Sequence, residues 1–145
     1  MKIVIQRVTS ASVSINHTVV SSIGKGAAVL IGFHQNDTKE TARWMAKKLI
    51  HLRYFQDHEG KTNLSLQDVQ GELLVISQFT LYASCEEGRR PSLIHAASPV
   101  IAKPLYDFFI QELTHELKNV KTGVFGADMA LSLVNDGPFT LIIER

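Results

Sequence analysis

Two short segments place polar side chains where the surrounding sequence is apolar. The first is Ser77-Gln78-Phe79-Thr80, which brings two hydroxyl groups and one amide to the end of an apolar run. A hydroxyl group can act as a nucleophile or position a substrate, and an amide can both donate and accept hydrogen bonds. Such a segment is more often a strand end with satisfied polar groups, so its spacing alone does not establish a function.

The second segment is Asn135-Asp136-Gly137-Pro138-Phe139-Thr140, which lies between two apolar stretches. An Asp-Gly-Pro sequence between strands is by default a turn, and cis X-Pro bonds are rare, about 5–6% in folded proteins. Like the first segment, it carries no function by spacing alone.

Other chemistry-bearing patterns are absent from the sequence. There is no glycine-rich phosphate loop and no dinucleotide-binding fingerprint. The histidines show no metal-ligand spacing; they are His17, His34, His51, His58, His95 and His115. We therefore expect no metal and no cofactor. Only Arg89 and Arg90 lie near enough in sequence to lower the pKa of the thiol of Cys85, which is interpreted as a small, inert side chain.

Length and composition predict one soluble domain covering residues 1–145. The net charge of +1 argues against binding nucleic acid, DNA included, through a global positive field, so such a partner would need a local basic patch. A single cysteine indicates a reducing compartment. The apolar run before Arg7 is too short for a signal peptide, and no stretch approaches the ~20 residues that span a bilayer. The expected location is the cytoplasm.

Alternating and continuous apolar patterns predict a strand-rich chain. The turn that joins the first two strands is expected at Asn16-His17. The segment 72–81 begins apolar and becomes polar, so the Ser77–Thr80 group would end a buried strand. The expected strands are residues 3–15, 19–23, 27–33, 72–81, 120–125, 130–134 and 139–143.

Two helices are predicted from apolar residues at helical spacing. The first is capped by Asp37 or Thr38. The second begins at Pro99, or only near Lys103 because Pro104 would remove a helical hydrogen bond. The helices do not alternate with single strands, which favours an α+β fold: a curved, barrel-like, mostly antiparallel β-sheet with two outer helices. Short terminal strands with exposed edges favour a homodimer.

The two polar segments resemble the two signature motifs of the D-aminoacyl-tRNA deacylases, also called D-tyrosyl-tRNA deacylases. Further segments are similar to this family in the same order along the chain: Ile5–Val8, Gly71–Val75, Gly88–Ser92 and Phe125–Met129. Because the matching segments fall in register over essentially the whole chain, it is identified as a member of the family. Three positions depart from the usual pattern, namely Phe139, Leu93 and Thr62, and Phe139 adjoins the Gly-Pro pair and so bears on the shape of the pocket.

The resemblance implies a homodimer that hydrolyses the ester between a D-amino acid and the 3′-terminal adenosine of tRNA, with glycyl-tRNA as a further substrate. It also implies that the Gly137-Pro138 bond is cis and reaches into the pocket of the partner subunit. The wall of that pocket would be Ser77, Gln78, Phe79 and Thr80.

Chirality would then be read by the carbonyl oxygens of Gly137 and Pro138, which accept hydrogen bonds from the substrate ammonium and leave no room for an L side chain. Two mechanisms stay open. Thr80 could be the nucleophile, although no His or Asp is at hand to activate it. We favour assistance by the ribose 2′-hydroxyl, with main-chain N–H groups of Phe79 and Thr80 stabilising the oxyanion and Thr80 as a positioning group.

The tRNA 3′ end should meet an apolar slot for its last base, for which Phe125 and Met129 are the candidates. Arg7 is interpreted either as part of the site or as a structural brace that donates to a carbonyl of the Gly-Pro loop. The expected phosphate contacts are Arg89, Arg90 and a basic helix face of Lys39, Arg43 and Lys47.

Without the resemblance, two other classes remain. One is a dimeric β-rich module that binds a small ligand or RNA without chemistry. The other is a general esterase that uses Thr80 or Ser77 and would hydrolyse small esters lacking tRNA.

Overall fold

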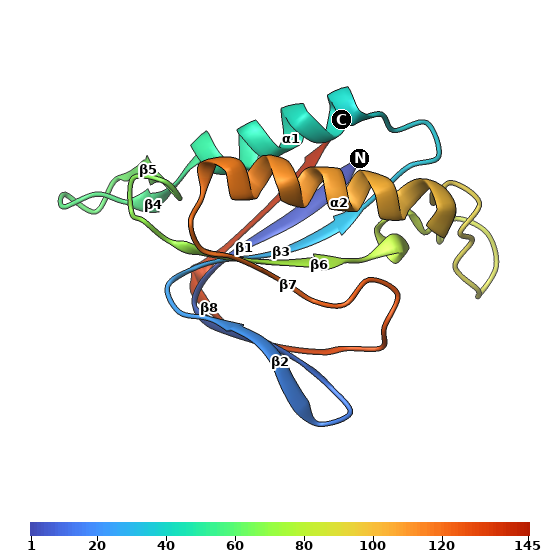
Figure 1. The fold of residues 1–145 in the computed structure, drawn as a ribbon, viewed down its shortest axis with the longest axis horizontal. Helices are drawn as coiled ribbons and strands as arrows, with labels where there is room; N and C mark the ends of the chain where they lie inside the picture. The colour runs from blue at the N-terminus through green and yellow to red at the C-terminus, as the bar shows by residue number, and fades with distance from the viewer.

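The computed structural model describes all residues 1–145. It is an α+β fold in which two helices cover one face of a strongly curved sheet (Figure 1). The elements are β1 (Lys2–Ile15), β2 (Thr18–Ile23), β3 (Gly26–Gly32), α1 (Lys39–His51), β4 (Arg53–Gln56), β5 (Thr62–Ser65), β6 (Glu72–Ser77), the 3₁₀ turn η1 (Phe79–Tyr82), α2 (Pro99–Glu116), β7 (Val120–Thr122) and β8 (Ala130–Glu144).

The long strand β1 organises the sheet. Its one edge pairs with β8, and its other edge is shared by β3 along the first half and by β2 along the second half, all antiparallel. β3 then pairs with β6, and β6 with β7, both in parallel. The edge strands β2 and β7 approach each other, and Ser21 Oγ donates to the Thr122 carbonyl oxygen at 2.7 Å. The sheet is therefore a nearly closed, mixed barrel, less antiparallel than the sequence suggested.

The parallel pairs explain where the helices sit. Parallel neighbours need a crossover connection, because a tight hairpin joins only antiparallel strands. α1 lies in the connection from β3 to β6, and α2 is the crossover from β6 to β7. Each helix therefore lies between two parallel strands of the main sheet, although three strands, β4, β5 and β6, separate α1 from α2 along the chain. The hairpin β4–β5, not predicted, extends this connection beyond α1 (Figure 1).

The ends of the helices follow from local chemistry. The Thr38 hydroxyl accepts from the Thr41 N–H and caps α1, as one of the two predicted caps. α2 begins at Pro99, so the later start near Lys103 is wrong. Pro99 needs no N–H in the first turn, and Pro104 removes only the bond to the carbonyl of Val100, a residue that is 84% exposed to water.

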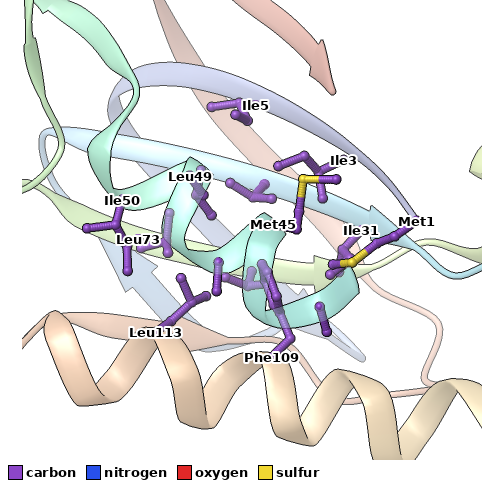
Figure 2. Packing of buried hydrophobic residues seen from close by; sticks show 14 of the residues in the cluster. Met1, Ile3, Ile5, Ile31, Met45, Leu49, Ile50, Leu73, Phe109 and Leu113 are labelled. Atoms are coloured by element: carbon purple, nitrogen blue, oxygen red, sulfur yellow. The ribbon is translucent and has the colours of Figure 1, made fainter. Parts of the chain in front are cut away.

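Two buried clusters lie on the two faces of the sheet, because successive strand residues point to opposite sides. The larger packs α1 and α2 onto the sheet, with Met45, Leu49, Phe109 and Leu113 among its members (Figure 2). The smaller lies inside the curl of the sheet; it comprises Val8, Ala11, Val13, Ile23, Ala28, Leu74 and Ile76. The helices of this fold are too short or too polar to cross a bilayer.

Four predicted strands are corrected by the structure. The strand predicted over 72–81 ends at Ser77, and the next residues form η1. The one predicted over 120–125 ends at Thr122. The segments 130–134 and 139–143 belong to one strand, β8, so the Asp-Gly-Pro sequence is not a turn between two strands.

Candidate functional site

The Ser77–Thr80 segment lies where β6 stops and η1 begins. The Gln78 N–H donates to the Ile31 carbonyl oxygen at 2.7 Å, which holds the chain beside β3. After Gln78 the chain passes over Gly32, where a Cβ atom would lie 2.9 Å from the Gln78 carbonyl oxygen. Only a residue without a side chain permits this close approach, so Gly32 positions the segment.

The polar groups of this segment are joined to each other. Gln78 Nε2 donates to Thr80 Oγ1 at 2.6 Å, which fixes the position of an otherwise exposed hydroxyl group. The Phe79 side chain is 56% exposed, which is unusual for an aromatic residue that follows a buried strand. No histidine or carboxylate donates to or accepts from Thr80. The turn therefore presents a positioned hydroxyl group without a base.

A cavity of about 530 Å³ opens beside this turn. It lies between the ends of β3 and β6, the first turn of α2 and the loop after β7. Its wall is mostly apolar, with Ser77, Gln78 and Asp128 as polar exceptions. The lining is Leu30, Ile31, Gly32, Phe33, Ile76, Ser77, Gln78, Phe79, Ala97, Pro99, Ala102, Phe125, Gly126, Ala127, Asp128, Met129 and Leu131. A slot of this kind accepts a flat or apolar group and offers a few polar contacts.

The loop after β7 brings Phe125 and Met129 to the cavity. Met129 folds back over Gly123, where a Cβ atom would lie 2.6 Å from its sulfur, and the Val124 N–H lies 3.4 Å from that sulfur. Phe125 packs against Tyr106 with ring centroids 5.6 Å apart.

Tyr106 anchors this wall from α2. Its hydroxyl group donates to the Val75 carbonyl oxygen at 2.9 Å, within β6. Burial raises the pKa of the Tyr106 phenol, so the group stays a neutral donor.

The second polar segment is a bulge within β8. Gln6 pairs with Thr140 and Val8 with Asn135, so residues 136–139 lie opposite Arg7 alone. Within it, the Gly137-Pro138 peptide bond is cis and Gly137 has a φ of +127°. Both residues are exposed, and neither lines the cavity of their own chain.

Arg7 braces this bulge from beneath. Its Nε lies 3.2 Å from the Asp136 carbonyl oxygen and 3.1 Å from Asp136 Oδ2, and its Nη1 donates to the Tyr54 carbonyl oxygen at 2.8 Å. Its guanidinium carbon lies 4.8 Å from the centroid of the Phe139 ring. Arg7 is only 5% exposed. Of its two interpretations, the structure contains the brace.

The expected phosphate-binding residues do not form one surface. Arg89 and Arg90 are exposed in the loop between η1 and α2, outside the cavity wall. Arg43 pairs with Glu112 at 3.2 Å. Both Arg43 and Lys39 lie over the ring of Phe108. Lys47, one turn further along the same helix, lines a separate hollow together with Trp44. The basic face predicted on the first helix is thus divided.

Sequence reasoning missed part of the wall. Ala97 lines the cavity just before α2, Pro99 and Ala102 line it from the first turn of that helix, and Asp128 lines it from the loop that contains Gly126. Of the missed wall residues, only Gly32 could have been noticed in the sequence, because a glycine there ends a continuous apolar strand. The structure holds no cluster of three or more His, Cys, Asp or Glu side chains able to bind a metal ion.

Known proteins resemble the chain over its full length. Residues 4–144 match the family described as D-Tyr-tRNA(Tyr) deacylase. The chain is 53% identical to a D-aminoacyl-tRNA deacylase of Protochlamydia amoebophila, covering 99% of the chain and 95% of that protein. It is 50% identical to a D-aminoacyl-tRNA deacylase of Flavobacterium psychrophilum, covering 99% and 97%.

Two solved structures share the architecture. A c-Myc DNA unwinding element binding protein superposes with a TM-score of 0.95 at 38% identity, covering 100% of the chain and 99% of that protein. A probable eukaryotic D-amino acid tRNA deacylase superposes with a TM-score of 0.85 at 20% identity, covering 98% and 97%. The second likeness concerns the fold alone.

Proposed function

The chain belongs to the D-Tyr-tRNA(Tyr) deacylase family, and we propose from this premise that it removes D-amino acids from mischarged tRNA during translation proofreading. It is a D-aminoacyl-tRNA deacylase, a hydrolase of the ester that links the amino acid to tRNA. One observation carries the finer proposal: of the two signature segments, one borders the cavity and the other is an exposed bulge outside it. Two copies are needed to bring them together.

The proposed enzyme is a homodimer in which each bulge enters the cavity of the partner subunit. Support comes from β8, whose outer edge pairs with no strand of its own chain. Val134 and Ile142 on this strand are 58% and 69% exposed, and Phe79 at the cavity is 56% exposed. Apolar side chains beside an open strand edge are what a subunit interface covers.

The bulge would act as the chirality filter. The carbonyl oxygens of Gly137 and Pro138 accept hydrogen bonds from the substrate ammonium, which fixes the direction of the bond to the α-carbon. A D side chain then points away from the bulge, whereas an L side chain collides with it. Each ~1.4 kcal/mol of this collision gives about tenfold discrimination. Glycine has no side chain to collide, so glycyl-tRNA is a substrate as well.

The proposed chemistry uses the substrate's own ribose. The 2′-hydroxyl next to the ester activates or orients water, and good placement of such a group can contribute ~7–11 kcal/mol. Thr80 has no base to activate it, and its hydroxyl group is already bonded to Gln78. We therefore assign Thr80 to positioning, and the main-chain N–H groups of Phe79 and Thr80 to the developing oxyanion.

The 3′-terminal adenine would occupy the apolar slot formed by Phe125 and Met129, which lies in the same cavity as the first signature segment. Stacking on an aromatic ring accepts a base without reading a long sequence. Arg89 and Arg90, on the exposed loop after η1, would then contact the phosphates of the approaching 3′ end.

The test is to incubate the protein with matched D- and L-aminoacyl-tRNA and to measure hydrolysis as the loss of the labelled amino acid from the tRNA. We expect rapid loss from the D and glycyl esters and none above the uncatalysed rate from the L ester. Binding of both esters without hydrolysis would instead indicate a binding module. Equal hydrolysis of small esters that lack tRNA would indicate a general esterase.

A further inference from the structure

A second hollow, of about 500 Å³, lies on the outer face of α1, away from the cavity. Its wall is basic, with one aromatic ring and no carboxylate. The lining residues are Trp44, Lys47, Lys48, His51, Leu52 and Arg53. In a chain whose net charge is only +1, this concentration of cations marks a local anion-binding surface.

The two lysines of this hollow are not paired with acidic side chains. Neither Lys47 nor Lys48 forms a salt bridge, whereas Arg43 on the same helix is paired with Glu112. Arg53 donates to the Asn63 side chain at 3.1 Å, and His51 lies 3.3 Å from Glu116. Asp68 is also near: hydrogen bonds from Ser65 and, to a smaller degree, the charges of Arg53 and His51 lower the pKa of its carboxyl group. Unpaired lysines at the surface are available to a negatively charged partner.

A further cation stacks on the aromatic ring of the hollow. Trp44 is 36% exposed, and the guanidinium carbon of Arg145 lies 4.3 Å from the centroid of its ring. This stacking brings a charge from the end of β8 to the edge of the hollow. Lys and Arg clustered on one face are typical of surfaces that contact a nucleic acid backbone.

The position of the hollow fits a long RNA ligand. The cavity contacts the first turn of α2, at Pro99 and Ala102, whereas His51 pairs with Glu116 in the last turn. Because a helix rises 1.5 Å per residue, the two sites are about 20 Å apart along α2. The first turn of α2 and the last turn of α1 lie at opposite ends of the helical layer (Figure 1). A tRNA whose 3′ end occupies the cavity must continue across the surface, and the helical layer leads to the hollow.

We propose that this hollow binds the sugar–phosphate backbone of the acceptor stem, with Lys47, Lys48 and Arg53 contacting phosphates. This inference rests on the proposed function, since it concerns the same substrate at a distance from the reacting ester. Double-stranded RNA is recognised mainly through its shape and its phosphate and 2′-hydroxyl groups, so the contact is independent of sequence. The hollow would raise affinity for intact tRNA without taking part in hydrolysis.

Trp44 is the only tryptophan of the chain, so its fluorescence reports on this hollow. We expect uncharged tRNA to change the Trp44 emission, and an aminoacylated oligonucleotide limited to the single-stranded 3′ end to leave it unchanged. The Lys47→Gln/Lys48→Gln double variant should bind tRNA roughly tenfold more weakly at about 0.1 M salt. The slope of its binding constant against salt concentration, on logarithmic axes, should fall by the equivalent of about one to two phosphate contacts.

The matched control is Lys25→Gln/Lys121→Gln, which removes two exposed lysines that line neither site and form no salt bridge. It should bind tRNA like the unaltered protein. Hydrolysis of the short D-aminoacyl oligonucleotide separates the two proposals. If the unaltered protein hydrolyses it but tRNA does not change the Trp44 emission, or if both double variants bind tRNA equally, the hollow is not an RNA site. If no D-aminoacyl ester is hydrolysed, the proposed function fails instead.

Discussion

Arg7 on β1 lies alone opposite the bulge of β8 and donates from its Nε to the carbonyl oxygen of Asp136, 3.2 Å away. The same guanidinium donates to the Tyr54 carbonyl oxygen, so one buried side chain ties the bulge to the segment after α1. The shape of the bulge therefore depends on a residue 129 positions earlier in the chain. A planar group with several donors suits this role because it serves several acceptors at fixed angles.

Replacing Arg7 with Met should lower the free energy of unfolding by about 2–4 kcal/mol, because two carbonyl oxygens lose their donor in a buried place. Urea denaturation measures this change. Asp136→Asn is the matched control. It removes the charge of a side chain that is 41% exposed and leaves the carbonyl bond in place, so its cost should stay below about 1 kcal/mol. Equal losses in the two variants would show that the ion pair, not the carbonyl brace, holds the bulge.

Gly137→Ala should severely impair deacylation and cost about 1–3 kcal/mol of stability. Its φ of +127° disfavours any L side chain, and a Cβ atom would lie 2.9 Å from Arg7 Nη2. The assay is hydrolysis of D-aminoacyl-tRNA by protein shown to be folded by circular dichroism.

Gly60→Ala provides the comparison, because Gly60 also has a positive φ, +77°, but has open space around it. The Gly60→Ala variant should be about 1 kcal/mol less stable and should keep its full activity. A fully active Gly137→Ala variant would contradict the proposed filter.

Much of the fold could be predicted because local patterns determined it. The alternation in β1, the hairpin that returns as β2, the continuous apolar run of β3 and the cap at Thr38 are local features, and the structure confirms each of them. The pairing of β3 with β6 depends instead on a crossover through α1, which no local pattern indicates. This is why the share of parallel pairing was underestimated.

The site was less predictable, because distant residues shape it. The turn after Ser77 exists because Gly32 lets the chain approach β3 closely. The bulge of β8 exists because Arg7 supplies donors beneath it. From the sequence, Asp-Gly-Pro was interpreted as a turn, although its neighbours on both sides continue to pair with β1. The two segments could be singled out from the sequence, but their geometry depends on partners far along the chain.

Two buried tyrosines should respond in opposite ways to loss of the hydroxyl group. The Tyr54 hydroxyl is buried without a hydrogen-bond partner, so Tyr54→Phe should be neutral or stabilise by about 1 kcal/mol. The Tyr106 hydroxyl donates to Val75, so Tyr106→Phe should cost about 1 kcal/mol. Urea denaturation at pH 7 checks both values, and a loss from Tyr54→Phe as large as that from Tyr106→Phe would mean that the Tyr54 hydroxyl has a partner.

The same pair predicts how stability depends on alkaline pH. Burial raises the pKa of both phenols, so the folded chain keeps these protons where the unfolded chain begins to release them. Their contribution is fully present below about pH 10 and is lost as the pH rises further. Each Phe variant should therefore lose less stability than the unaltered protein between pH 9 and 11, measured by urea denaturation. An unchanged slope in both would contradict this origin.

Thr80 and the substrate 2′-hydroxyl can be separated by removing each in turn. If Thr80 only positions the substrate, Thr80→Val should slow hydrolysis about tenfold, because a positioning contact is lost but the activating group remains. A 2′-deoxy D-aminoacyl ester should react at least about a hundredfold more slowly with the unaltered protein. Single-turnover rates with both substrates measure this, and Thr18→Val, an exposed site without side-chain hydrogen bonds, is the control. An inactive Thr80→Val variant together with a normally reacting 2′-deoxy ester would assign the nucleophile to Thr80.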